Sequence, residues 1–199
     1  TTEIYTLSLH DALPISHDRV FVVDEAYVDF GGESCIPLLA DFPNLVIVRT
    51  FSKSLCGAGL RLGYLVASPD LVNAVTTVKN SLNHFPVDYL AQQAGIAACR
   101  DAGYYARCAR LVAEERESFS AFLKEKGWEV IPSRTNFVFA RKIDGASGKA
   151  KDGQGLYRAI KEKGILVRHF ATAGIEDYLR ITVGTHGQMQ ALREAMADL

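Results

Sequence analysis

The chain has 199 residues, of which 48% are hydrophobic and 23% charged, and its formal net charge is −1 at pH 7. This composition is ordinary for a globular protein of one domain or somewhat more, and a near-neutral balance without a basic block argues against nucleic acid as a partner. No apolar run approaches the ~18 residues that a membrane helix needs, so we expect no membrane partner either.

Cysteine usage and the first residues indicate the compartment. The four cysteines form no CxxC pair and show no metal-like spacing with the five histidines. The N-terminal stretch lacks the basic start and long apolar core of a secretory signal. We therefore expect a cytoplasmic protein with reduced thiols and no metal site.

The first part of the chain predicts three strands. Apolar, largely β-branched runs lie at residues 19–23, 45–48 and 62–67. Such uninterrupted runs are typical of strands buried on both faces, as in a parallel or mixed sheet covered by helices. Polar residues directly after the ends of such strands are where α/β sheets usually build their sites.

Helical periodicity follows the strands. Apolar residues recur at three- and four-residue spacing over residues 69–80, 87–101 and 104–125. Pro69 suits a first helical turn, Gly103 is expected to separate two helices, and Gly127 to end the third.

The remainder predicts a small α+β unit. We expect strands at 129–131 and 136–140, a Gly-, Ser- and Lys-rich loop at 142–155, a helix at 156–163, strands at 165–168 and 178–183, and a helix at 188–199. The domain boundary is expected inside the long helix, giving domains of residues 17–112 and 113–199.

Residues 1–16, TTEIYTLSLHDALPIS, fit neither a helical stripe nor a strand alternation. They resemble the translation of sequencing-adapter DNA that occurs at broken ends of assembled genes. We expect a non-native lead-in, the alternative being a natural irregular one.

Candidate catalytic and ligand-binding residues lie at the ends of the first predicted strands. Lys53 directly follows a buried strand, where desolvation favours the neutral amine that can attack a carbonyl and form a Schiff base. Asp24 ends the preceding strand, and Tyr27 lies three residues further on. The glycines that surround Arg61 allow close backbone approach to a ligand, and the arginine offers forked donors for phosphate. Their spacing matches neither GxGxxG nor a P-loop, so a nucleotide-binding module is the weaker alternative.

Five motifs occur in order: DEAYVDF, RTFSKSLCGAGLRLGY, NSLNHFPVD, SRTNFVFA and YLRITVG. Together they resemble the fold-type I pyridoxal-phosphate enzymes, and most closely the histidinol-phosphate aminotransferases, from about residue 20 to residue 199. The resemblance implies an α/β fold, namely the C-terminal part of the large domain, with a mixed, mainly parallel sheet, plus a small α+β C-terminal domain.

The resemblance also implies the cofactor and the residues that hold it. Lys53 would hold the aldehyde of pyridoxal 5′-phosphate as an internal aldimine, and then shuttle a proton as general base and acid. Asp24 would keep the pyridine nitrogen protonated, and Tyr27 would bond the phenolic oxygen of the ring. Ser52 and Arg61 would hold the phosphate.

Substrate contacts are implied in the second domain. Arg180 matches the arginine that grips the substrate α-carboxylate. Arg168 is a weaker match to a second substrate-side arginine, and its alternative is an exposed charge at a strand end. Asn136, which begins a predicted strand, matches a position facing the active site or serves only a turn.

The implied reaction converts L-histidinol phosphate and 2-oxoglutarate to imidazole acetol phosphate and L-glutamate in histidine biosynthesis, in a homodimer. Alternatives are a related aromatic aminotransferase, a threonine-phosphate decarboxylase, or a catalytically inert fragment. The last arises because the resemblance starts well inside the large domain. The family's glycine-containing phosphate turn, its ring-stacking aromatic and the asparagine that also bonds the phenolic oxygen would lie upstream. We therefore expect an N-terminally truncated chain that is inactive alone.

Overall fold

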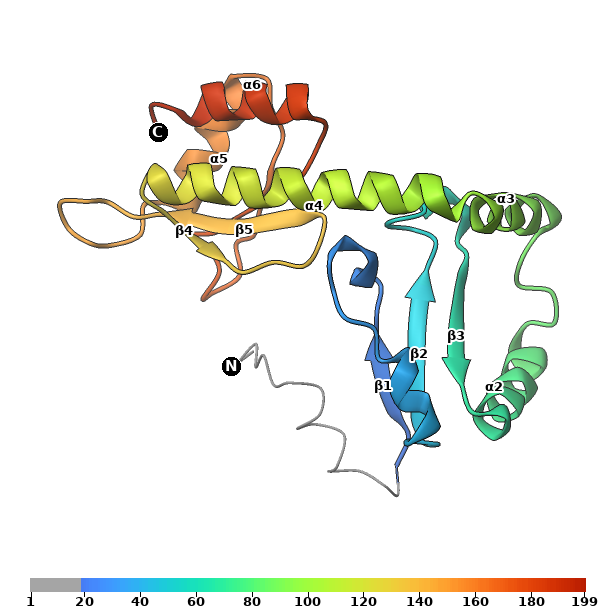
Figure 1. Ribbon diagram of the computed structural model, residues 1–199. Helices are drawn as coiled ribbons and strands as arrows, with labels where there is room; N and C mark the ends of the chain where they lie inside the picture. Colours follow the sequence, from blue (N-terminus) through green and yellow to red (C-terminus); the bar gives the residue numbers. More distant parts are fainter. Residues whose placement is uncertain (1–18) are drawn as a thin grey trace. The chain divides into compact units, whose positions relative to one another are not determined.

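The computed structural model describes residues 19–199, so the expectation for residues 1–16 lies outside the described part. The described chain divides into two compact units (Figure 1). One unit contains the residues up to Val28 together with Gly32–Tyr105, and the other contains Asp29–Gly31 and Ala106–Leu199. The division falls inside α4 (Ala102–Glu125). The boundary expected after residue 112 lies further along the same helix and stays a prediction.

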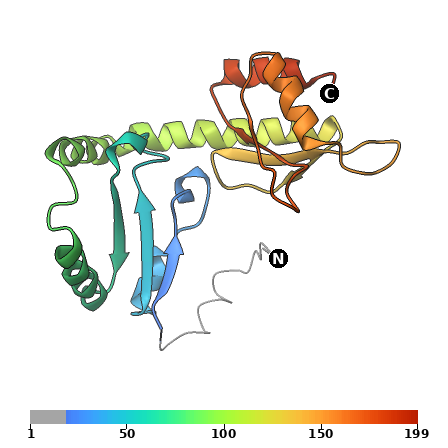
Figure 2. The same cartoon turned by 180° about the vertical axis from the view of Figure 1, so that it is seen from behind.

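The first unit is built on a three-stranded mixed sheet in the order β1-β2-β3 (Figure 2). β1 (Phe21–Asp24) runs parallel to β2 (Leu45–Thr50), and β3 (Gly63–Ala67) runs antiparallel to β2. The helices along this stretch are the 3-10 helices η2 (Val28–Phe30), η3 (Ile36–Ala40) and η4 (Ala58–Leu60), followed by α2 (Pro69–Leu82) and α3 (Tyr89–Arg100). The three strands therefore form where the apolar runs predicted them.

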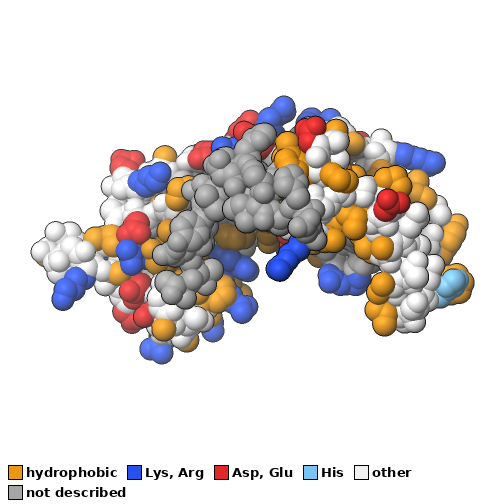
Figure 3. Space-filling view, turned by 90° about the horizontal axis from the view of Figure 1, so that it is seen from below, with side chains coloured by type: hydrophobic (Ala, Val, Ile, Leu, Met, Phe, Trp, Pro, Cys, Tyr) orange, Lys and Arg blue, Asp and Glu red, His pale blue; other side chains and the backbone are white. Residues whose placement is uncertain are grey.

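The two faces of this sheet are buried unequally: on the face opposite Leu45 and Ile47, Val46 is buried but its neighbours are not, so the expectation of burial on both faces holds only in part. Leu45 and Ile47 are fully buried in a cluster with Cys35, against which residues of η3 pack. On the opposite face Val22 is 57% exposed and Val48 37% exposed. α2, the helix that follows β3, contributes no buried residue. Figure 3 shows hydrophobic side chains at the surface of this unit.

Local signals set the helix ends. Pro69 lies in the first turn of α2, as expected. α3 and α4 are separated at Asp101, so the expectation for Gly103 was wrong: this glycine lies inside the first turn of α4. Gly127 ends α4 as predicted, because it adopts φ +75° and its amide donates to the carbonyl of Lys124 at 3.0 Å.

The second unit is a sheet covered by helices on one side. Its four strands are antiparallel in the order β4-β5-β7-β6, with bounds β4 (Trp128–Ile131), β5 (Phe137–Lys142), β6 (Arg168–His169) and β7 (Leu179–Thr182). α5 (Gly153–Glu162) and α6 (His186–Met196) join the C-terminal part of α4 in burying one core against it. Val138 and Ile181, which lie opposite each other, point into this core. Their strand neighbours Phe139 and Arg180 therefore share the other face.

None of the helices in residues 19–199 combines the length and apolar character required to span a membrane.

Candidate active site

Two polar segments end the parallel strands of the first unit. Asp24 is the last residue of β1 and lies opposite Val48 of β2. Lys53 follows β2, which ends at Thr50. Because β1 and β2 are parallel, their carboxyl ends meet at one edge of the sheet, the position at which α/β proteins bind ligands.

Lys53 and Tyr27 come together at this edge. The Nζ atom of Lys53 lies 5.3 Å from the centroid of the Tyr27 ring, and both side chains are half-buried. Asp24 Oδ1 accepts the amide of Ala26 at 2.9 Å, which stabilises the turn that leads to Tyr27. An amine, a phenol and an exposed carboxylate are thus brought to one strand edge by local geometry.

The loop that carries Lys53 is closed by its own backbone. The amide of Gly57 donates to the carbonyl of Phe51 at 2.7 Å, and that of Cys56 donates to the carbonyl of Lys53 at 3.1 Å. A Cβ at Gly57 would lie 3.0 Å from the Phe51 carbonyl oxygen, so the close approach requires glycine there. Ser52 lies half-buried within the same loop.

Backbone strain is concentrated in the following residues. Among the non-glycine residues of 19–199, positive φ occurs at Cys56 (54°) and Arg61 (51°). Each such residue costs roughly 1–2 kcal/mol, and strain of this kind clusters at ligand-binding segments. The guanidinium of Arg61 is exposed, and its Nη1 donates to the Ala58 carbonyl at 3.0 Å.

Two arginines of the second unit lie side by side on the sheet face away from the helices. Arg168 is directly opposite Arg180 in the β6–β7 ladder, and both guanidinium carbons lie near the ring of Phe170, at 5.3 and 5.9 Å from its centroid. Arg180 Nε is buried and has no hydrogen-bond partner among the described residues. Like charges directly opposite each other destabilise a sheet, so this pair is suited to an anionic ligand.

Asn136 lies immediately before β5, not within it. Its backbone carbonyl accepts the amide of Val183 at 2.9 Å, which extends the pairing of β5 with β7. The expectation that Asn136 begins the strand was therefore displaced by one residue.

A buried charged group that was not predicted from the sequence lies beside the site. The carboxylate of Glu25, which follows Asp24, accepts hydrogen bonds from the Cys35 amide, the Ser34 hydroxyl and the Arg49 guanidinium. Burial would raise the pKa of Glu25, but these bonds hold it below its usual range. Burial also raises the pKa of the Cys35 thiol to about 12, with the neighbouring Glu25 adding to the shift.

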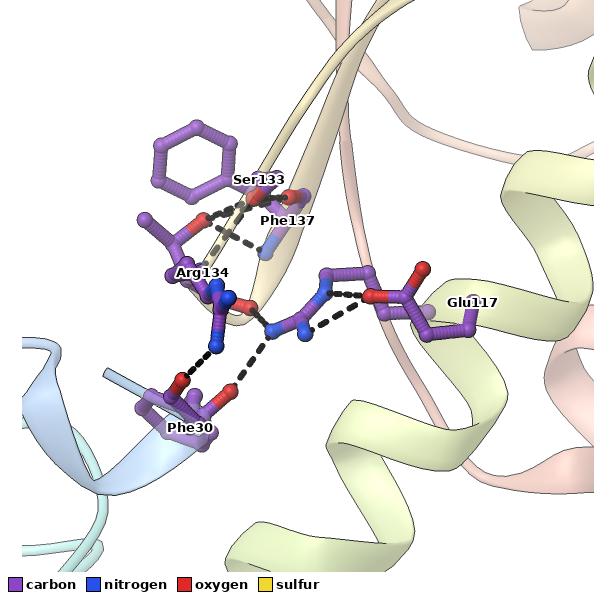
Figure 4. A network of polar contacts seen from close by, with 8 residues as sticks. Phe30, Glu117, Ser133, Arg134 and Phe137 are labelled. Carbon is purple, nitrogen blue, oxygen red and sulfur yellow. Dashed lines mark hydrogen bonds and ion pairs between the residues drawn. The ribbon is translucent and has the colours of Figure 1, made fainter. Parts of the chain in front are cut away.

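A second missed residue is Arg116, which lies on the apolar side of α4 and is 3% exposed. Its Nη1 donates to the carbonyls of Phe30 at 2.9 Å and Thr135 at 2.8 Å, and its Nη2 donates to Glu117 at 2.8 Å (Figure 4). A charge three residues before the buried Phe119 was a readable signal, because helical spacing places both on one face.

The donor set at the first-unit edge fits pyridoxal phosphate. The cofactor requires an amine for its aldehyde, an anion for its pyridine nitrogen and cationic or hydroxyl donors for its phosphate. Lys53, Asp24, Arg61 and Ser52 are side chains of these kinds, on the end of β1 and on the segment between β2 and β3. A mixed α/β sheet with this donor set defines the class of fold-type I pyridoxal-phosphate proteins.

Within that class, the chain belongs to the family "Aminotransferase class I and II", which it matches over residues 9–197. Histidinol-phosphate aminotransferases are among its curated relatives. That of Syntrophus aciditrophicus (strain SB) is 45% identical over 182 residues, covering 92% of this chain and 49% of the relative. That of Aromatoleum aromaticum is 47% identical over 180 residues, covering 90% and 49%. The chain thus spans about half the length of the curated relatives it matches.

Solved structures agree on the fold. Histidinol-phosphate aminotransferase from Sinorhizobium meliloti, in complex with pyridoxal-5′-phosphate, aligns with a TM-score of 0.70 and 29% identity, covering 89% of this chain and 47% of that one. L-threonine-O-3-phosphate decarboxylase from Porphyromonas gingivalis aligns with a TM-score of 0.75 and 27% identity, covering 95% and 57%. The family and the fold class that the motifs implied are therefore confirmed.

Proposed function

We propose that the chain carries the lysine-bearing part of a pyridoxal-phosphate aminotransferase that acts on L-histidinol phosphate and 2-oxoglutarate in histidine biosynthesis. The observation that carries this proposal is the approach of the Lys53 amine to the Tyr27 ring at the strand edge that ends in Asp24. The roughly 45% identity to histidinol-phosphate aminotransferases over nine-tenths of the chain supports the choice of substrate.

Bound pyridoxal phosphate supplies an electron-accepting ring that makes the substrate Cα proton acidic. Lys53 would hold the cofactor aldehyde, and once the substrate amine has displaced it, the freed Lys53 amine would serve as general base and then general acid. The Asp24 carboxylate would keep the pyridine nitrogen protonated, and the Tyr27 hydroxyl would bond the phenolic oxygen. Ser52 and Arg61 bind the phosphate, the arginine through charge-assisted hydrogen bonds.

The second unit binds the substrate in this proposal. Arg180 grips the substrate α-carboxylate, which supplies the partner that its buried Nε lacks. Arg168 adds a second positive charge beside it, and an anion between the two relieves their repulsion. Asn136 faces the same substrate from the start of β5.

The threonine-phosphate decarboxylase is the second candidate, because one such enzyme aligns over 95% of this chain. In this alternative the same residues of the chain would hold the cofactor, and the substrate carboxylate would leave as carbon dioxide. We further propose a homodimer and a cytoplasmic location, for which the family and the biosynthetic role of the relatives are the support.

Titration of the purified chain with pyridoxal phosphate tests the cofactor site. We expect a new near-visible absorbance band, and borohydride reduction followed by peptide mass spectrometry should find the cofactor on Lys53. Lys53→Ala should abolish both signals, whereas Lys79→Ala, at an exposed lysine of the same unit, should keep them. Equal labelling of many lysines would contradict the assignment.

The substrate is tested in a protein of the relatives' full length, made by joining residues 19–199 to the N-terminal half of the Aromatoleum aromaticum relative. We expect amino transfer from L-histidinol phosphate to 2-oxoglutarate. Release of carbon dioxide from L-threonine phosphate without amino transfer would instead favour the decarboxylase.

A further inference from the structure

A buried ion pair joins the two strands that carry the candidate site. Glu25 follows Asp24 directly and is 6% exposed. Arg49 is the penultimate residue of β2. Its Nε and Nη2 both donate to Glu25 Oε2, at 3.0 and 2.8 Å. The pair therefore links the end of β1 to the end of β2 through side chains as well as through the backbone ladder.

The Glu25 carboxylate also accepts hydrogen bonds from Ser34 and Cys35. The amide of Cys35 donates to Oε1 at 2.5 Å, and the Ser34 hydroxyl donates to Oε2 at 3.0 Å. Arg49 Nη2 also donates to Ser34 Oγ at 2.9 Å. A buried pair that is bonded this completely is costly to break, because removal of one partner leaves the other uncompensated.

The ion pair lies behind the candidate site. Asp24 and Glu25 are consecutive, so their side chains leave opposite faces of the sheet. Two backbone hydrogen bonds connect Glu25 to its surroundings. Its amide donates to the Val48 carbonyl at 2.9 Å, and its carbonyl accepts the amide of Val28 at 3.2 Å. The second bond closes the turn that contains Tyr27.

We propose that Glu25 and Arg49 are positioning residues, whose ion pair holds the ends of β1 and β2 so that Tyr27 lies against the Lys53 amine. This inference rests on the proposed function, because the residues that the pair holds in place are the proposed cofactor-binding residues. Glu25 acts through its neighbour Asp24 and through the turn that follows.

Hydrogen exchange on the cofactor-free chain tests the positioning. Glu25→Gln keeps the shape of the side chain and removes its charge. The amides to follow, on both sides of the site, are those of Ala26, Val28, Cys56 and Gly57. We expect their exchange to quicken on the order of tenfold more than that of the central amides of β2, which report the general loss of stability.

Glu129→Gln is a matched control. Arg141 Nε and Nη2 donate to Glu129 Oε2 at the same 3.0 and 2.8 Å, but in the second unit. This variant should leave the four amides unchanged. A rise confined to residues 34–35 would overturn the proposal, because the pair would then anchor only that segment. A uniform rise throughout the first unit would also overturn it, because the effect would then be general destabilisation.

A second variant and a second measurement complete the test. If Glu25→Gln does not fold, Arg49→Lys keeps the charge and loses the forked geometry, and the same amides are compared. Titration with pyridoxal phosphate should then show affinity weakened on the order of tenfold. A wild-type chain that takes up no cofactor contradicts the proposed function, while the exchange data still decide the positioning. Equal affinity of wild type and variant contradicts the positioning alone.

Discussion

Each unit contains a buried charged side chain that is bonded to several partners. The side chain of Glu25 is 3% exposed and that of Arg116 is 4% exposed. Each is bonded to backbone atoms as well as to an opposite charge. Hydrogen bonds to charged groups are the stronger class, and they offset the cost of removing the charge from water.

Glu25 gives the protein a specific pH dependence. Its pKa is held below the usual 4.5 in the folded chain, so its stabilisation is complete above about that pH and is lost as the pH falls through the lowered value. Glu25→Gln should cost about 2–4 kcal/mol at pH 7. The difference in unfolding free energy between the wild type and Glu25→Gln should become smaller below pH 4.5, because only the wild type loses this contribution there. Urea unfolding followed by circular dichroism between pH 7 and pH 3 measures both curves.

The control for that series is Glu33→Gln, at an exposed glutamate of the same unit. It should follow the wild type at every pH. Wild-type and Glu25→Gln curves that remain parallel into acid would contradict the role assigned to the Glu25 carboxylate.

At the scale of elements, side-chain caps and glycines decide where helices begin. Asp152 caps α5 by accepting the amides of Gln154 at 3.1 Å and Gly155 at 3.0 Å. Thr185 and Gln188 form a capping box at the start of α6. These local signals fix the ends of both helices over the sheet of the second unit.

Two helical glycines of this unit should respond oppositely to alanine. A Cβ at Gly153 would lie 2.4 Å from the carbonyl oxygen of Glu176, so Gly153→Ala should destabilise the protein by roughly 2 kcal/mol or more. A Cβ at Gly187 meets no atom within 4 Å, so Gly187→Ala should stabilise it by about 0.5–1 kcal/mol. Urea denaturation of both variants measures the changes. Equal effects would show that helix propensity alone governs both sites.

The two units of the molecule differ in how much they bury. The second unit has one core to which its three helices and its sheet contribute. In the first, the cluster beneath the sheet centres on Cys35, Leu45 and Ile47. Since burial of apolar surface is the main stabilising contribution, the second unit should open less often.

Hydrogen exchange of the whole chain measures that difference. The slowest amides should be those of β5 and β7, around the fully buried Val138 and Leu179. Amides of β1 and β3 should exchange at least about tenfold faster, because these strands border a partly exposed face. Equally slow exchange in both sheets would show that the units open together.

The sequence by itself determined the elements and the candidate chemistry. Apolar runs, helical periodicity, Pro69 and Gly127 are local signals, and the structure places elements where they indicate. Asp24 and Lys53 could be singled out because Asp24 ends an apolar run and Lys53 lies in the segment that follows the next one. The family could be recognised because its motifs are contiguous in the chain.

Only the tertiary structure decided which charges are buried and which faces are covered. Glu25 is buried and its neighbour Asp24 is exposed, because Arg49 lies 24 residues away in sequence and beside it in space. Arg116 donates a hydrogen bond to the carbonyl of Phe30, which is 86 residues away in sequence. Arg168 lies opposite Arg180 because β6 pairs with β7, and on one face of the first sheet Val46 is buried while Val22 is exposed. Burial depends on such distant partners, which no local pattern contains.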